Sequence, residues 1–276
     1  MIYDSFDDIQ CVVVEKDSTQ YLSFSEVMKL PTPKDYFNFL LFFFPNDNGY
    51  YEKPYIKECI SSWKRVFPKS RLINVPIFEA QGLSKWSMIT YHRKNFPTDS
   101  LRVLLASHLN NCFYVDTDVF LTNRLELPLK KDCFVLQGCS GTMLWNRNKG
   151  NKKLLKWFEK YEEVADFILK NSENRIEMDR LIDDYGDIRM YQKYGAALKI
   201  PSENIKAGVN HFSNIYPYMR DKKTVGIAIN PKGSIASFEI ESLYAFSLYC
   251  YERGYTDNIS ICFYDPINYQ NIGFYT

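Results

Sequence analysis

The residues of this chain with the clearest chemical potential are two aspartates that follow an apolar segment. Asp116 and Asp118 stand in the sequence Tyr-Val-Asp-Thr-Asp-Val-Phe-Leu, residues 114–121. Because alternate side chains of a strand point the same way, the two carboxylates would share one face at a strand's end. A divalent cation relieves the cost of such a like-charge pair. Oxygen-rich, incomplete sites of this kind suit Mg or Mn, with water or substrate phosphates in the remaining positions. Alternatively, both aspartates are solvated turn residues without a ligand. The Asp-x-Asp motif alone does not distinguish this from a metal site.

The segment just upstream, residues 97–111, predicts a helix with Thr98 as its N-cap. Its buried stripe comprises Leu101, Leu104, Leu105 and Leu109. Asp99 and Arg102 lie three residues apart and would share the opposite face. A first-turn acid paired with an arginine is also an ordinary structural arrangement, favoured by the helix dipole. Both a structural ion pair and a ligand-binding pair therefore fit.

Strand-like and helix-like segments alternate along the chain. Strands are predicted at 37–44, 71–78, 112–121 and 131–138, and helices at 53–68, 97–111, 151–170 and 175–185, with a strand and turn at 197–205. This order predicts an α/β fold with a Rossmann-like, mainly parallel central sheet flanked by helices on both faces. Ligands of such sheets sit beyond the carboxyl ends of the strands, where Asp116 and Asp118 are expected.

Composition narrows the class of protein. The 276 residues are interpreted as an N-terminal appendage packed on the core (1–33), a core (34–230) and an aromatic-rich segment of the same domain (231–276). A net charge of +1 without basic runs argues against a nucleic-acid partner. The start resembles no signal peptide, and the run 37–44 is too short to cross a bilayer, which allows peripheral membrane contact at most. Seven cysteines without a CxxC pair indicate a reducing compartment, so a cytoplasmic protein is expected.

Five segments carry a resemblance to a known family. They are CISSWKRVFP (59–68), TDSLRVLLASHLNNCFYVDTDVFL (98–121), SGTMLWNRNKGN (140–151) and, more loosely, IEMDRLI with GVNHFSN (176–182 and 208–214). With these, the chain resembles the retaining GT-A glycosyltransferases of the family 32 type. That group includes capsular polysaccharide and lipooligosaccharide sugar transferases and is related to clostridial glucosylating toxins and glycogenin-like transferases. The resemblance implies a GT-A fold and transfer of a hexose from a nucleotide-sugar, UDP-sugar above all, to a glycan, glycolipid or protein acceptor, with retention of configuration.

The resemblance also implies roles for individual residues. Asp118 would be the firmer metal ligand, whereas Asp116 would share the metal and touch the ribose. Asp99 and Arg102 would contact the sugar and ribose-phosphate part of the donor, and Arg102 would also act in catalysis. The family stacks a first-strand tryptophan on the base, and this chain has Phe42-Phe43-Phe44 there. Phe43 is accordingly expected at the base.

Three further residues have weaker sequence support. His211 corresponds to a metal-binding histidine of the glycogenin-like relatives, and its imidazole would favour Mn over Mg. Asp179 would place a carboxylate near the transferred sugar, in competition with a solvated helix face. Lys222 belongs to a small basic cluster that would close over a diphosphate, and a solvated turn explains it equally well.

Two other functions remain open on the sequence. A metal-dependent sugar nucleotidyltransferase shares the sheet architecture, but its Gly-rich phosphate loop is absent from residues 45–53, which contain one glycine. A non-catalytic carbohydrate-binding scaffold on a decayed transferase fold is the second, and the intact Asp99, Arg102, Asp116 and Asp118 argue against it.

Overall fold

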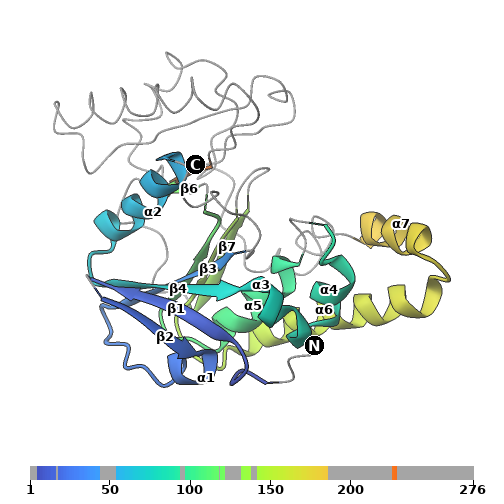
Figure 1. Ribbon diagram of the computed structural model, residues 1–276, viewed down its shortest axis with the longest axis horizontal. Helices are drawn as coiled ribbons and strands as arrows, with labels where there is room; N and C mark the ends of the chain where they lie inside the picture. The colour runs from blue at the N-terminus through green and yellow to red at the C-terminus, as the bar shows by residue number, and fades with distance from the viewer. Residues whose placement is uncertain are drawn as a thin grey trace, which may run out of the picture.

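A single seven-stranded sheet organises the protein (Figure 1). The computed structural model describes residues 5–16, 18–43, 54–93, 97–117, 119–121, 132–137, 142–185 and 226–228. The sheet has the order β2-β1-β4-β3-β5-β8-β7. Its strands are β1 (Gln10–Glu15), β2 (Ser18–Ser23), β3 (Phe37–Phe43), β4 (Ser70–Pro76), β5 (Cys112–Val115), β7 (Cys133–Gln137) and β8 (Thr142–Asn146). Two short strands, β6 (Val119–Leu121) and β9 (Gly226–Ala228), pair separately and antiparallel.

The centre of the sheet is parallel and its margins are antiparallel. β3 pairs parallel with β4 on one side and with β5 on the other. The pairs β1–β2, β1–β4, β5–β8 and β7–β8 are antiparallel. The α/β class is therefore confirmed, but the expected mainly parallel sheet is wrong for the strands described. The pattern of apolar residues predicts that a strand exists, whereas its direction depends on how the chain returns to the sheet.

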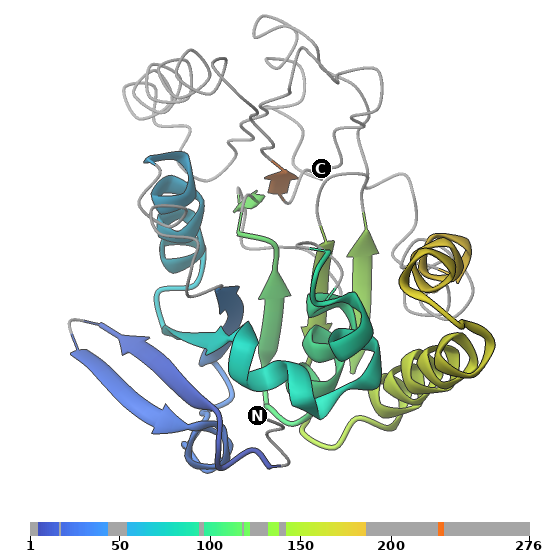
Figure 2. The same ribbon diagram turned by 45° about the vertical axis from the view of Figure 1, so that its right-hand side comes forward.

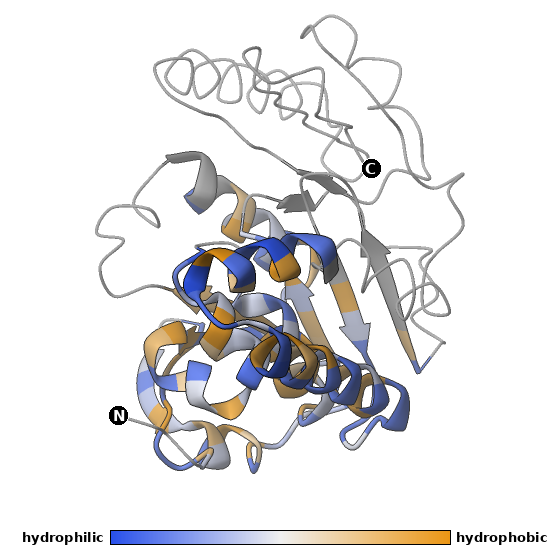
Figure 3. Ribbon diagram, turned by 90° about the vertical axis from the view of Figure 1, so that its right-hand side faces the viewer, coloured by the Kyte–Doolittle hydropathy of each residue, from blue (hydrophilic) through white to orange (hydrophobic). Residues whose placement is uncertain are grey.

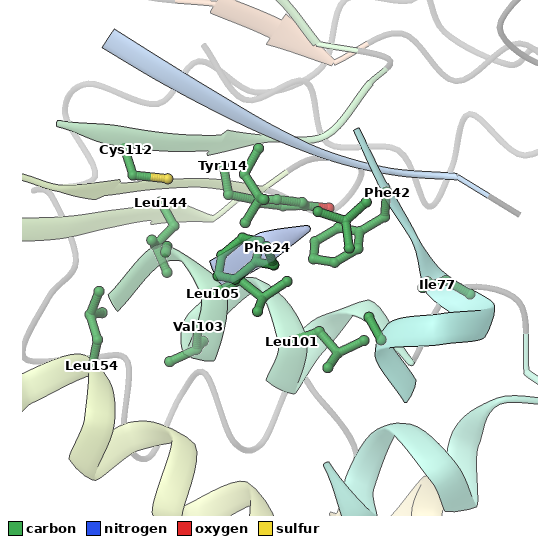
Figure 4. Packing of buried hydrophobic residues seen from close by; sticks show 14 of the residues in the cluster. Phe24, Phe42, Ile77, Leu101, Val103, Leu105, Cys112, Tyr114, Leu144 and Leu154 are labelled. Atoms are coloured by element: carbon green, nitrogen blue, oxygen red, sulfur yellow. The ribbon is translucent and has the colours of Figure 1, made fainter. Parts of the chain in front are cut away.

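Helices cover both faces of the sheet, as the alternation predicts. The described helices are α1 (Phe24–Val27), α2 (Pro54–Val66), α3 (Ile77–Ala80), α4 (Lys85–Thr90), α5 (Thr98–Ser107), α6 (Lys152–Asn171) and α7 (Arg175–Tyr185), with a 3-10 turn at Gln81–Leu83. On one face, Phe39 of β3 and Phe113 of β5 pack with Trp63 and Phe67, from α2 and the turn after it. The alternate residues of these strands face α5 instead, as Figure 4 shows for Phe42, Cys112 and Tyr114.

The central strand β3 is buried on both faces because helices cover each of them. Its sequence FNFLLFF has six buried residues and a half-buried Phe43 at the end. An almost entirely apolar run, here interrupted only by Asn38, is typical of a strand inside a covered parallel sheet. Seen from the side of α6 and α7, apolar and polar positions alternate along the helices (Figure 3). The buried positions of α6 recur at helical spacing and comprise Leu154, Trp157, Tyr161, Ala165 and Ile168.

One local prediction needs correction. The strand expected at 71–78 ends at Pro76, and helix α3 starts at Ile77, because Pro76 has no backbone N–H with which to continue a ladder. The N-terminal residues form two strands and a short helix, and β1 is hydrogen-bonded to β4 as part of the main sheet. Figure 2 shows this hairpin at one side of the sheet and helices α6 and α7 at the other. The predicted helix at 53–68 is present as α2, and those at 151–170 and 175–185 as α6 and α7.

The cysteines in the described ranges are buried thiols. They are Cys11, Cys59, Cys112 and Cys133. Burial, together with the nearby Glu79, raises the pKa of the Cys11 thiol to about 12, and burial also raises that of Cys112. These groups stay protonated at neutral pH and act as small apolar side chains. None of the helices described has the length and apolarity needed to cross a membrane.

Candidate functional site

The neighbouring strands β3 and β5 mark a topological switch point of the sheet. After β3 the chain passes through α2 to reach β4 on one side of β3. From β4 it returns through α5 to reach β5 on the other side of β3. Open α/β sheets bind ligands in the crevice beyond the carboxyl ends of two such strands. Asp116 immediately follows β5 at this end.

Four side chains meet at this point. The Asp116 carboxylate accepts a hydrogen bond from the Tyr114 hydroxyl. Nη1 of Arg102 lies 3.7 Å from Oδ1 of Asp116. The same guanidinium forms an ion pair with Asp99, one turn earlier on α5, and its Cζ lies 4.8 Å from the centroid of the Tyr114 ring. The site thus joins the first turns of α5 to the end of β5.

The charged residues of the site differ in exposure. Asp99 and Arg102 are only 2% and 4% exposed, whereas the side chain of Asp116 retains 26%. A buried carboxylate and guanidinium are tolerable only as a pair, because each alone carries a large desolvation cost. The pair therefore places a fixed positive group beside Asp116, and of the two carboxylates Asp116 is the one that faces solvent.

The burial of α5 extends beyond its predicted leucine stripe. All residues from Asp99 to Ser107 are buried, including the opposite face that carries Asp99 and Arg102. Leu101, Leu104, Leu105 and Leu109 are buried as predicted. Thr98 is not the N-cap: Pro97 occupies that position, with no side-chain hydrogen bond to the helix. A helix enclosed on every side holds its polar residues only because they have partners within the protein.

The structure locates Asp179 elsewhere, on helix α7. Its Oδ1 lies 2.7 Å from Nε2 of His92 and 3.6 Å from Nε of Arg175. No contact joins it to Asp99, Arg102 or Asp116 in the described part of the chain. Its predicted place near a transferred sugar stays a prediction.

Other predicted site residues have mixed outcomes. Phe43 is half-buried at the last position of β3, in register with Pro76 at the carboxyl end of β4. This places Phe43 at the carboxyl end of the central strands, and its expected contact with the base stays a prediction. Asp118, His211 and Lys222 lie outside the described residues.

The described residues include part of the donor set that a metal ion would need. Asp116 offers hard carboxylate oxygens, which suit Mg and Mn. Asp99 is occupied by Arg102, and the described ranges contain no group of three or more His, Cys, Asp or Glu residues able to hold a metal. Asp116 fits the proposed role, and the remaining ligands predicted for the ion are Asp118 and His211.

Two aromatic residues at the site escaped the sequence analysis. Tyr114 touches both Asp116 and Arg102, and Phe42 of β3 lies against it with ring centroids 5.9 Å apart (Figure 4). The signal was present for Tyr114, since it precedes Asp116 by two residues and would share its face of the predicted strand. The signal for Phe42 was not, because no local pattern predicts that β3 lies beside β5.

Comparisons with known proteins leave the family open. Family models, curated proteins and solved structures were compared with this chain, and no significant match was found among them.

Proposed function

We propose that this protein is a metal-dependent glycosyltransferase of the GT-A type. It moves a hexose from a nucleoside-diphosphate sugar, UDP-sugar first among the candidates, to an acceptor hydroxyl with retention of configuration. The observation that carries the proposal is the position of Asp116. It stands at the carboxyl end of β5, at the switch point of the sheet, with the buried Arg102–Asp99 pair directly behind it.

The chemistry of the described residues supports a phosphate-bearing ligand. Arg102 supplies a permanent positive charge. Its guanidinium is held in one orientation by Asp99 on one side and the Tyr114 ring on the other. A charge fixed in a poorly hydrated setting stabilises negative charge on a leaving group more strongly than a solvated one. Asp116 would hold a divalent cation together with Asp118. The bound cation would neutralise charge on the departing diphosphate.

The arrangement assigns different tasks to the two acidic residues near Arg102. Asp99 is almost fully buried and engaged, so it orients the guanidinium. Asp116 is partly exposed and can reach a ligand from solvent. This division explains why a sugar transferase would need both carboxylates beside the same arginine.

A donor-hydrolysis and transfer assay tests the proposal. The protein is incubated with UDP-, GDP- and dTDP-sugars in the presence of Mn²⁺, Mg²⁺ or EDTA, and free nucleoside diphosphate is measured. Release should require the metal and fall about 100-fold or more in Asp116→Asn and Asp118→Asn, the scale of losing one preorganised electrostatic contact. Asp184→Asn, an exposed change on α7, serves as the matched control and should retain full activity.

Other results would point to other functions. Formation of pyrophosphate from a sugar phosphate and a nucleoside triphosphate would identify a nucleotidyltransferase. Sugar binding with no metal-dependent release would indicate a non-catalytic scaffold. Asp179→Asn belongs in the same series: a role near the sugar predicts a strong loss of release, whereas a purely structural contact with His92 predicts activity close to wild type.

A further inference from the structure

Tyr114 connects the two charged groups of the site. Its hydroxyl donates a hydrogen bond to Oδ1 of Asp116, and its ring lies beneath the guanidinium of Arg102 at 4.8 Å. Arg102 belongs to α5, whereas Asp116 follows β5. One side chain therefore sets the relative position of groups from two separate elements.

The Tyr114 ring is itself held in place. In the sheet register Tyr114 stands between Leu40 of β3 and Leu144 of β8. Phe42 packs against the Tyr114 ring with an interplanar angle of 49°. Figure 4 shows Tyr114 above the leucines of α5. A side chain confined on every side by packed neighbours loses little additional freedom when it orients a ligand-binding group.

We propose that Tyr114 is a positioning residue of the metal–diphosphate site. It fixes the Asp116 carboxylate through its hydroxyl and the Arg102 guanidinium through its ring, and it acts through them rather than by contact with the donor. This inference rests on the proposed function. Hydrogen-bond partners of metal-binding carboxylates orient these ligands, and their loss commonly weakens metal binding by about 10- to 100-fold.

The first test uses Mn²⁺ alone as the probe. Tyr114→Phe removes the hydroxyl and keeps the ring under Arg102, so the dissociation constant for Mn²⁺, measured by electron paramagnetic resonance, should rise about tenfold or more. Nucleoside diphosphate release should then recover as the Mn²⁺ concentration increases, which a variant that is merely unstable would not do. Tyr114→Leu also removes the ring, and added Mn²⁺ should not restore its activity.

Tyr161→Phe is the matched control. Tyr161 is a buried tyrosine of α6 within the same hydrophobic cluster, packed against Trp86 rather than against Asp116. Its loss of a hydroxyl should leave the Mn²⁺ affinity unchanged. A double-mutant cycle of urea unfolding tests the hydrogen bond between Tyr114 and Asp116 in the absence of metal. Tyr114→Phe should lower the unfolding midpoint of the wild-type protein. The same change should have no effect in a protein that already carries Asp116→Ala.

The outcomes separate this inference from the proposed function. Wild-type Mn²⁺ affinity in a folded Tyr114→Phe protein, or strictly additive effects in the cycle, would overturn the role of Tyr114 while the transferase proposal stands. A wild-type protein that neither binds Mn²⁺ nor releases nucleoside diphosphate would overturn both.

Discussion

At the scale of single residues, the surroundings of a titratable side chain decide whether its charged form is favoured inside the fold. Arg102 is enclosed between Asp99, Asp116 and the Tyr114 ring, which keeps a guanidinium inside the fold. His108 shows the opposite effect, because its surroundings disfavour the charged form. It is half-buried at the end of α5, and Phe6 packs edge-on against its ring at 4.8 Å.

His108 should make stability depend on pH. Burial, and then the charge of Lys149, lower the pKa of His108 below its ordinary value of about 6.5. These effects outweigh the helix C-terminus, which alone would favour the protonated ring. As the pH falls below 6.5 the unfolded chain binds a proton that the folded protein resists, so the free energy of unfolding decreases. The decrease stops below the lowered pKa.

Urea unfolding between pH 8 and pH 5 measures this dependence. His108→Gln should flatten the decline seen in the wild-type protein, and Lys149→Gln should reduce it partly because the second cause is removed. An unchanged slope in both variants would assign the pH dependence to other groups.

At the scale of elements, helix α5 depends on a side chain from a distant strand. Asn146 ends β8 and is completely buried. Its Nδ2 donates to the carbonyl oxygens of Ala106 and Leu109, at 2.8 and 3.1 Å, where α5 ends. Its Oδ1 accepts from Nδ2 of Asn151 at 3.0 Å, which links the start of α6 to the same point. Helix ends leave carbonyls that need such donors.

Asn146→Ala should therefore destabilise the protein strongly. The substitution leaves buried carbonyls without this donor and opens a small void, and each unsatisfied group costs about 1 to 3 kcal/mol. A loss of at least about 2 kcal/mol is expected in urea unfolding. Asn148→Ala is the control, because Asn148 is exposed, and it should change stability by about 0.5 kcal/mol or less. Equal effects of the two variants would show that Asn146 does not hold the end of α5.

Some features of these elements could be predicted from the sequence, and others could not. The apolar runs predicted β3, the leucine stripe predicted α5, and the spacing of Asp99 and Arg102 predicted a shared helix face, on which the two residues form an ion pair. Local patterns could not predict that β8 runs antiparallel to β5 or that α5 is enclosed on all sides. These features come from contacts between segments far apart in the chain, which composition and periodicity do not contain.

At the scale of the whole molecule, one hydrophobic cluster joins the N-terminal hairpin, the central sheet and helices α4 to α7 on the α5 side of the sheet. It runs from Ile9, just before β1, through the residues around α5 to Ile182 of α7. The N-terminal segment shares this cluster and the central sheet, so its folding is coupled to that of the site-bearing strands. Helix α7 joins it through Ile182, with Met178 and Leu181 packed alongside.

Charged contacts also join helix α7 to the turn after α4. These contacts should contribute less to stability than the apolar contacts of Ile182. Arg93 lies 2.7 Å from Asp183 and lowers the pKa of that carboxyl, but Asp183 is 60% exposed. Solvent-exposed pairs contribute about 0 to 1 kcal/mol, whereas truncating a buried isoleucine to alanine costs about 2 to 5 kcal/mol. Ile182→Ala should thus release α7, and Asp183→Ala should not.

Hydrogen exchange of the α7 amides, read beside urea unfolding, distinguishes the two contacts. Ile182→Ala should speed exchange throughout α7 and lower the unfolding midpoint, and Asp184→Ala, on the exposed side, should do neither. Because the pKa of Asp183 is lowered in the folded protein, its small contribution is present at neutral pH and is lost as the pH falls through the carboxyl range. If Asp183→Ala instead released α7 as fully as Ile182→Ala, the ion pairs rather than apolar burial would hold this helix. The contact between His92 and Asp179 would then be equally important for the position of Asp179.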